Sequence, residues 1–425
     1  MVRVPSPSLA AAAALALNAV VVVALWGPAG VRDIHDAASL LTGLGRLTGL
    51  LGAYLALVQL LLLARIPGLE LDRLVRLHRW NGFACLALVL AHAVLITAGY
   101  TLGDGISLPA EVERLLTGYP GVITAVAGLV ALIAVTVTSV AIVRRGLRYE
   151  TWYFAHLYAY LGVALAFSHQ LATGSDFVGD PLARGYWYAL YAVTVGSLVV
   201  FRVGLPLVRS TWHRLRVVRV IDEGPGVVSL EIGGVRLDRL KARTGQFFTW
   251  RFLTRDRWWE AHPFSLSAAP DGRRLRITVK GLGDHTRSLR DIRAGTRVIV
   301  EGPFGGFTTT GRRVALIAGG VGITPIRALL EDMPGDIAVV YRATREEDVI
   351  LRAELDELAR RRGADLHYVV GAAPLSPERL LELVPDLPDR DVFVCGPPAM
   401  TEAMRESLGR TGVPRRQVSV ERFAF

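Results

Sequence analysis

The stretch HRWNGFACLALVLAH, residues 78–92, is an apolar segment that begins and ends on histidine. A second stretch, TWYFAHLYAYLGVALAFSHQ at residues 151–170, carries His156 and His169. One histidine in such a segment is most simply a hydrogen-bonded core residue. Ionisable residues inside membrane spans are costly, however, and usually mark a ligand or a pathway. Two pairs with spacings of 14 and 13 residues therefore need a common explanation.

The first half of the chain has the composition of a membrane protein. Of the 425 residues, 52% are hydrophobic and only 20% are charged, and residues 1–210 contain several apolar runs long enough to cross a bilayer. Arginine-rich loops alternate with acidic or mixed loops, which places both termini in the cytoplasm and the protein in the cell membrane. We predict six transmembrane helices, at about residues 8–26, 47–64, 80–100, 121–143, 152–172 and 185–208.

Charge and cysteine content exclude some classes of protein. The formal net charge of +10 is carried largely beside the spans, and no basic stripe interleaved with aromatic residues suggests nucleic-acid binding. The only cysteines, Cys85 and Cys395, exclude a four-cysteine iron–sulfur cluster of the chain's own and a disulfide framework. The apolar runs indicate the lipid bilayer as a partner, and the sequence identifies no protein partner and no oligomeric state.

The four histidines fall at two depths of the predicted bundle. The third and fifth spans both run outward, so His78 and His156 share the inner level and His92 and His169 the outer level, about 20 Å away. Paired imidazoles on facing helices commonly hold haem iron, whereas zinc would need further ligands. Structural or proton-relay histidines are the alternative. Thirteen helical steps miss the starting face by about 140°, so the fifth helix is irregular or its rings approach from different sides.

The second half predicts two soluble domains. Short alternating strands from residue 211 favour a small antiparallel β-barrel over 211–310, and alternating strands and helices favour a doubly wound α/β domain over 311–425. In the latter, GGVGITP (319–325) and CGPPAM (395–400) each leave a strand and open a helix on the same carboxyl edge, where phosphates bind. In the barrel, VKGLGDHTRSL (279–289) is a further candidate phosphate cradle.

Taken together, the two histidine pairs and six spans resemble the ferric reductase and NADPH oxidase superfamily. The order of HPFSLSAAP (262–270), the glycine turn and the two later motifs resembles the ferredoxin–NADP reductase fold, which supplies the cytoplasmic part of that superfamily. The resemblance implies two b-type haems held by the four histidines, FAD, and NADPH or NADH. It also implies that Arg46 lies near the outer haem, the alternative being an interfacial arginine.

The resemblance assigns roles to individual residues of the soluble half. Ser265, Cys395 and Glu421 would surround the nicotinamide during hydride transfer, and Phe423 would stack on the flavin, with Phe425 as the competing candidate. The remaining implied contacts are His262, Pro263, Phe264, Ser265, Gly283 and Thr286 for FAD, and Gly319, Gly320, Gly322, Thr324, Pro325, Cys395, Gly396 and Pro397 for the nicotinamide cofactor.

The sequence leaves alternatives for the nicotinamide cofactor and for the electron acceptor. Arg342 and Arg345 follow the second strand of the nucleotide domain and favour a 2′-phosphate, hence NADPH, although Glu346, Glu347 and Asp348 could contact the ribose of NADH instead. The expected function is electron transfer from NAD(P)H through FAD and two haems to an outside acceptor: a ferric chelate, dioxygen or quinone. A membrane quinone or partner-protein reductase and a haem-based redox sensor are the alternatives.

Overall fold

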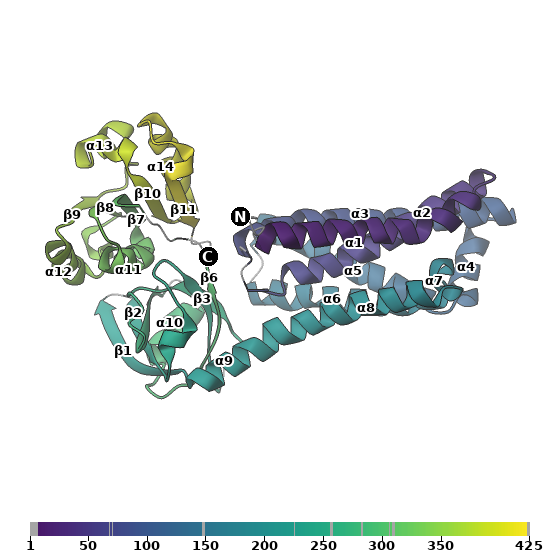
Figure 1. The fold of residues 1–425 in the computed structure, drawn as a ribbon, viewed down its shortest axis with the longest axis horizontal. Coiled ribbons are helices and arrows are strands. Elements are labelled where there is room, and N and C mark those ends of the chain that lie inside the picture. Colours follow the sequence, from purple (N-terminus) through teal and green to yellow (C-terminus); the bar gives the residue numbers. More distant parts are fainter. Residues whose placement is uncertain are drawn as a thin grey trace, which may run out of the picture. The chain divides into compact units, whose positions relative to one another are not determined.

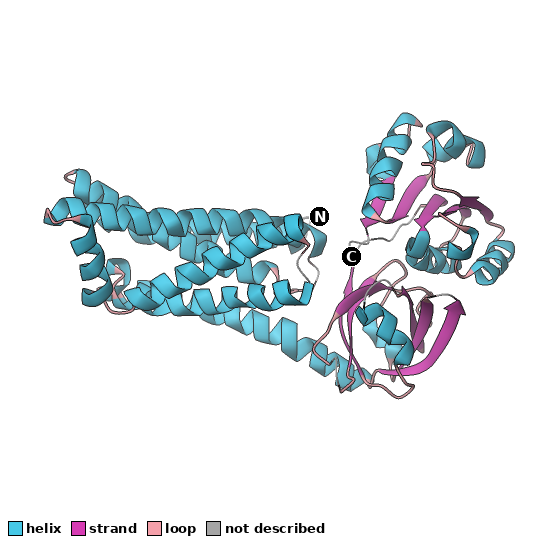
Figure 2. Cartoon of the chain, turned by 180° about the vertical axis from the view of Figure 1, so that it is seen from behind, coloured by secondary structure: helices cyan, strands magenta, loops and turns pink. Residues whose placement is uncertain are grey.

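The computed structural model describes residues 7–422 except 68, 70, 147–148, 225, 256–257, 282–283, 306 and 308–310. The chain divides into two compact units, residues 1–203 and 204–425. The first unit is helical, and the strands of the described residues all lie in the second (Figures 1 and 2).

The helices of the first unit include the two that carry the histidine pairs. Their bounds are α1 Pro7–Arg32, α2 Ala37–Leu62, α3 Leu71–Asp104, α4 Leu108–Gly118, α5 Val122–Arg145, α6 Tyr149–Ala172, α7 Ser175–Val178 and α8 Pro181–Leu198, followed by a π-helical turn, η1 Val199–Gly204. Helix α2 begins ten residues before the predicted span because Asp36 and Ser39 form a capping box there.

In the described part of the chain, five stretches are long and apolar enough to cross a membrane, namely α1, α2, α3, α5 and Pro181–His213, which begins with α8. Six were expected. The remaining helix of that length, α6, has 24 residues, but two histidines, a glutamine and several tyrosines make it less apolar than the others. The histidines that make α6 a candidate for ligand binding thus also lower the hydropathy by which a membrane span is detected.

Glycines bring the helices of the bundle into close contact. Helix α2 packs along α3, and a Cβ added at Gly45 or Gly52 would lie within 3.0 Å of Ile96 or Val89 on α3. Helix α5 packs along α6 in the same way, since a Cβ at Gly128 would lie 2.6 Å from the carbonyl oxygen of Gly162. Small residues at such positions are typical of helix packing in membranes.

The end of the sixth predicted span leads directly into the second unit. Arg202, the one charge in that span, lies in the π-helical turn and donates to the carbonyl oxygen of Leu63 at the end of α2 (3.1 Å). The carbonyl would otherwise be one of the orphan acceptors of a helix terminus. Helix α9, Leu205–His213, then packs on strand β6, Val298–Phe304, and Ser210 Oγ accepts from the amide of Val300 (3.1 Å).

The first domain of the second unit contains two antiparallel sheets around one core. Their orders are β1-β2-β5 and β4-β3-β6, and single bridges, Arg216 to Arg297 and Leu266 to Ile277, join them at both edges. The predicted barrel therefore takes the form of two three-stranded sheets. The strands are β1 Arg216–Gly224, β2 Val227–Gly233, β3 Phe247–Phe252, β4 His262–Ser265, β5 Arg274–Lys280 and β6 Val298–Phe304, with α10 Asp284–Ser288 between the last two.

The second domain is a parallel five-stranded sheet of order β11-β10-β7-β8-β9, as the alternating pattern predicts. Helices α11 and α12 cover one face, and α13 and α14 cover the other. The strand order reverses between β7 and β10, where ligands of such sheets bind. The elements are β7 Arg313–Gly319, α11 Ile323–Asp332, β8 Asp336–Ala343, α12 Arg352–Arg362, β9 Asp365–Val370, α13 Pro377–Leu383, β10 Asp391–Gly396, α14 Pro398–Arg410 and β11 Val418–Arg422.

Candidate functional sites of the bundle and the reductase module

The four histidine rings meet in two pairs, at the two levels expected from the sequence. The ring centres of His78 on α3 and His156 on α6 are 6.0 Å apart, and those of His92 and His169 are 6.2 Å apart. An iron bound to one nitrogen of each ring at about 2 Å would place two facing ring centres about 6 Å apart. Both pairs therefore have the separation that a metal held between two imidazoles would require.

Hydrogen bonds fix which ring nitrogen is available at three of the histidines. Nδ1 lies 3.2 Å from the carbonyl oxygen of Gln59 at His78, 2.8 Å from that of Gly45 at His92, and 2.6 Å from that of Ala166 at His169. A carbonyl oxygen only accepts, so each Nδ1 carries the proton and donates it. Nε2 is then the basic nitrogen, which is the form of histidine that binds iron.

At His156 the acceptor is a side chain, and its own contacts decide the direction of the bond. Ser139 Oγ lies 3.1 Å from His156 Nδ1, donates to the carbonyl oxygen of Val135 (2.7 Å) and accepts from Trp152 Nε1 (3.3 Å). The single hydroxyl proton is used on Val135, so Ser139 accepts from His156 Nδ1. All four histidines consequently present Nε2 in the same tautomer.

The 13-residue spacing of His156 and His169 does not require a break in α6. Helix α6 runs unbroken from Tyr149 to Ala172, so its two rings reach the pairs from different sides of the helix. The ring of His169 donates to Ala166 of its own preceding turn, whereas that of His156 donates across to Ser139 on α5. Of the two explanations that the spacing left open, an irregular helix is wrong for this part of the chain.

Residues outside any motif complete the surroundings of the rings. Gln59 Nε2 donates to the carbonyl oxygen of His78 (2.9 Å), and Asn81 Nδ2 donates to Gln59 Oε1 (2.7 Å). Gly49 on α2 lies against His92, where an added Cβ would be 2.6 Å from Nδ1. Gly49 and Gln59 have no signal in the sequence, because each acts by its position on a neighbouring helix.

Arg46, which the resemblance places near the outer haem, lies in the third turn of α2, next to Gly45, whose carbonyl oxygen accepts from His92. Its guanidinium is 3.6 Å from the Asp33 carboxylate. The side chain is 18% exposed, in contrast with 77% for His35, which precedes α2.

In the reductase module, the three predicted hydride-transfer residues come from β4, β10 and β11 and lie together. Ser265 Oγ donates to Glu421 Oε1 (3.2 Å), and Cys395 is the register partner of Glu421 on the neighbouring strand. Burial, followed by the charge of Glu421, raises the pKa of the Cys395 thiol well above its ordinary value. We call these three residues, Ser265, Cys395 and Glu421, the hydride-transfer seat. Together they provide a hydroxyl, a protonated thiol and a carboxylate.

The two glycine motifs of the nucleotide domain meet beside this seat. A Cβ at Gly322 would overlap the carbonyl oxygen of Cys395, and one at Gly319 would overlap Met400 Sδ on α14. Gly320 has φ +54°, which favours glycine. Thr324 and Pro325 are buried in the first turn of α11, and Gly396 and Pro397 lead into α14, so both helix N-termini open at this edge.

The flavin residues are described only in part. Strand β4 pairs with β3, with His262 opposite Trp250 and Phe264 opposite Phe248, and Trp250 Nε1 donates to the carbonyl oxygen of Phe264 (3.0 Å). Pro263 lies between them, and Thr286 lies in α10. Gly283, Phe423 and Phe425 fall outside the described residues.

Arg342 is the last but one residue of β8 and Arg345 follows the strand, and the two arginines have different surroundings. Arg342 donates to the carbonyl oxygens of Ala372 and Ala373 (2.6 and 2.9 Å) and has no acidic partner among the described residues. Arg345 pairs with Glu347 (2.6 Å) and Asp348 (3.2 Å). Asp348 also accepts from Lys280 Nζ (2.9 Å), and both contacts lower its pKa, that of Lys280 more. Among the described residues at this strand end, Arg342 is therefore the arginine without a carboxylate partner.

Comparison with known proteins follows the same division of the chain. Residues 48–167 match the family described as ferric reductase like transmembrane component, 227–308 match an FAD-binding domain, and 316–406 match an oxidoreductase NAD-binding domain. His78, His92 and His156 lie inside the first match, and His169 lies just beyond its end. The fold and these matches define a multi-pass membrane oxidoreductase.

Individual relatives resemble different parts of the chain. It is 34% identical over 199 residues to the ferredoxin reductase component of 3-ketosteroid-9-alpha-monooxygenase from Mycobacterium tuberculosis, which covers 44% of this chain and 56% of the relative. It is 26% identical over 336 residues to ferric reduction oxidase 7, chloroplastic, from Arabidopsis thaliana, covering 69% of this chain and 41% of the relative. The chain thus spans about half the length of these curated relatives.

Among solved structures, the FAD/NAD-binding domain of nitric oxide dioxygenase from Vibrio cholerae is 23% identical and aligns with a TM-score of 0.43, covering 49% of this chain and 98% of that one. In its three parts, the chain resembles the ferric reductases: a ferric-reductase-like transmembrane component precedes a flavin- and nicotinamide-binding reductase module.

Proposed function

We propose that this protein passes electrons from cytoplasmic NAD(P)H, through FAD and two b-type haems, to a small-molecule acceptor outside the cell, such as a ferric chelate or dioxygen. The observation that carries the proposal is the pairing of four imidazoles at two levels of one bundle, 6.0 and 6.2 Å apart, with every Nδ1 hydrogen-bonded. Paired rings at one level alone would not reach from one side of a bilayer to the other.

The topology that this function needs has six spans, with α6 as the sixth and both termini in the cytoplasm of a cell whose plasma membrane holds the protein. The arginine-rich segments after α2, α5 and α8 support this orientation. The haem-bearing domain would extend over residues 1–210, the flavin domain over 211–310 as a closed barrel, and the nucleotide domain over 311–425. The inner pair, His78 and His156, would then be the one nearer the flavin.

When bound, FAD would convert a hydride into single electrons, and haem iron would carry them one at a time. The chain itself supplies placement. Ser265, Cys395 and Glu421 would hold the nicotinamide against the flavin, and the glycines at 319–322 and 396 would let backbone amides approach the pyrophosphate. The four histidines would hold two haems, with Gln59, Gly45, Ser139 and Ala166 keeping each Nε2 free to bind iron.

NADPH fits the nucleotide domain better than NADH. A 2′-phosphate needs a cation at the carboxyl end of β8, and Arg342 there has no acidic partner among the described residues. The acids that might instead bind a ribose hydroxyl are engaged with Arg345, Lys280 and Arg352. We expect kcat/KM for flavin reduction to be at least about tenfold higher with NADPH, since losing a charge-assisted pair costs 1.4 kcal/mol or more. Equal values for the two cofactors would contradict this assignment.

Gly49 provides a test of the outer site. In Gly49→Ala the new methyl group would lie 2.6 Å from His92 Nδ1, whose other constraint is the bond to Gly45. The ring must therefore turn, and we expect the haem content of the purified protein to fall from two per chain toward one. Pyridine haemochrome absorbance against protein concentration measures this ratio.

Gly196→Ala is the matched control for that substitution. Gly196 lies in α8 of the same unit, and an added Cβ would meet nothing within 4 Å, so its haem content should stay at the wild-type value. Two haems per chain in Gly49→Ala would show that His92 does not hold an outer haem.

Proteoliposomes test the function as a whole. With NADPH supplied on the side of the reductase module and a membrane-impermeant ferric chelate trapped on the other, we expect Fe²⁺ to appear in the lumen at a rate that depends on bound FAD and haem. Reduction only of chelate placed on the NADPH side would contradict the proposal, because the flavin would then serve its acceptor directly. A sensor would turn over poorly in either arrangement.

A further inference from the structure

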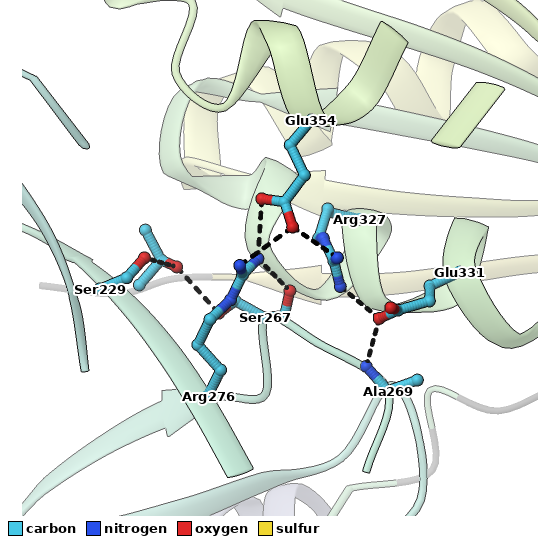
Figure 3. A network of polar contacts seen from close by, with 8 residues as sticks. Ser229, Ser267, Ala269, Arg276, Arg327, Glu331 and Glu354 are labelled. Carbon is cyan, nitrogen blue, oxygen red and sulfur yellow. Dashed lines mark hydrogen bonds and ion pairs between the residues drawn. The ribbon is translucent and has the colours of Figure 1, made fainter. Parts of the chain in front are cut away.

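Four charged side chains link the flavin domain to the nucleotide domain within the second unit (Figure 3). Arg276 lies on β5 of the flavin domain, whereas Arg327 and Glu331 lie on α11 and Glu354 lies on α12 of the nucleotide domain. None of the four belongs to a cofactor motif. We call these four residues the interdomain clamp.

Glu354 is the centre of the clamp. Arg276 Nη1 and Nη2 donate to its two carboxylate oxygens at 3.0 Å each, and Arg327 Nη2 donates to Oε1 at 2.5 Å. Arg327 Nη1 also donates to Glu331 Oε2, which accepts from the backbone amide of Ala269 (2.7 Å) in the flavin domain. Within the clamp the two domains are therefore joined twice, once through each glutamate, and separate contacts join Lys280 to Asp348 (2.9 Å) and Thr244 to Asp332.

The clamp is sheltered and electrically balanced. The side chains of Arg276 and Arg327 are 12% and 6% exposed, those of Glu354 and Glu331 are 32% and 27% exposed, and two guanidinium groups face two carboxylates. Burial alone would raise the pKa of Glu354, but the hydrogen bonds and charge of Arg276, and then of Arg327, hold it below its ordinary value. The carboxylate is thus charged throughout the neutral range, and sheltered pairs of this kind are screened only weakly by salt.

Both ends of the clamp are close in sequence to the hydride-transfer seat. Arg276 also donates to the carbonyl oxygen and Oγ of Ser267 (3.0 and 3.1 Å), two residues after Ser265. Arg327 follows Thr324 and Pro325 in α11, the helix that opens beside Cys395. A shift of either end would move β4, which would line the flavin, relative to α11, which would hold the nicotinamide cofactor. Misplacements of about 1 Å cost on the order of a hundredfold in rate.

We propose that the interdomain clamp, centred on Glu354, sets the distance between the nicotinamide and the flavin during hydride transfer. Its members are positioning residues, because none of them contacts the hydride-transfer seat. This inference rests on the NAD(P)H-to-FAD half of the proposed function. It predicts that weakening the clamp slows the hydride step itself and has little effect on cofactor binding, which Arg342 and the glycine motifs would govern.

Glu354→Gln in the full-length, FAD-loaded protein tests the proposal. Stopped-flow absorbance of the flavin, over a range of NADPH concentrations, separates the limiting rate from the half-saturating concentration. We expect the limiting rate to fall about tenfold or more and the half-saturating concentration to change less than about twofold. Arg276→Gln should reproduce this split, and Arg276→Lys, which keeps the charge but loses the paired donors, should retain more of the limiting rate than Arg276→Gln.

Asp336→Asn is the matched control. Asp336 also binds a buried arginine through two bonds of 3.0 Å, to Arg390, but both residues lie within the nucleotide domain. It should lower the melting temperature without slowing flavin reduction. An unchanged limiting rate in Glu354→Gln, or an equal loss in Asp336→Asn, would overturn the proposal. This test measures the reduction of the flavin by NADPH, which does not depend on electron transfer across the membrane. Failure of that transfer would contradict the proposed function but would not affect the result of this test.

Discussion

Replacing His92 with alanine will stop reduction of an acceptor on the outer side while flavin reduction by NADPH proceeds at its wild-type rate. His92 pairs with His169, so under the proposed function the variant would lose one ligand of the outer haem and keep the inner pair and the whole reductase module. We expect the rate of external reduction to fall at least about a hundredfold, because without the outer haem no carrier would connect the inner haem with the acceptor. Stopped-flow absorbance of flavin and haem, together with luminal Fe²⁺ in proteoliposomes, measures both halves.

His35→Ala is the control for that experiment. His35 precedes α2, the helix that carries Arg46, but its side chain is 77% exposed and its ring Nδ1 donates to the carbonyl oxygen of Asp33 two residues away. The substitution should leave haem content and external reduction unchanged. Continued external reduction in His92→Ala would take the outer haem off the electron path.

The second large effect is expected at the hydride-transfer seat. In Ser265→Ala the carboxylate of Glu421 loses the hydroxyl donor that lies 3.2 Å from it, and the group nearest the expected hydride path disappears. We expect flavin reduction to slow by about a hundredfold while the haem spectrum stays that of the wild type. The neutral thiol of Cys395, whose pKa burial raises, should add no ionisation to the pH profile through neutral pH.

Ser407→Ala is the corresponding control, since Ser407 is a partly buried serine on α14 of the nucleotide domain that donates to the carbonyl oxygen of Leu375. Its flavin reduction should match the wild type. A Ser265→Ala variant that transfers hydride at the wild-type rate would show that the serine, though placed beside Glu421 and Cys395, has no part in the step.

What the sequence could predict is what local pattern and spacing determine. The doubly wound sheet and its two glycine motifs follow from alternating strands and helices, and the structure has them at adjacent strand ends. The levels of the histidines follow from their distance along two helices that run in the same direction, and the structure brings the rings together in the expected pairs. The helix count was harder, because polar residues in α6 lower the signal on which it depends.

What the sequence could not predict depends on neighbours distant along the chain. Ser139 orients His156 from α5, and Gly49 leaves room for the ring of His92 from α2. The clamp joins Arg276, Arg327 and Glu354, which fall in three separate elements and carry no shared spacing. Such contacts are set by packing between elements, which a reading of one segment at a time does not contain.

Counting haem per chain tests the central claim most directly. Protein purified with its cofactors, and analysed for iron, haem and polypeptide in one sample, should contain two haems per chain. Both should have the low-spin spectrum of iron held by two histidines, and both should be reduced by NADPH without air. One haem per chain, or a high-spin spectrum from an iron with a single histidine ligand, would contradict the proposed path between the two histidine pairs.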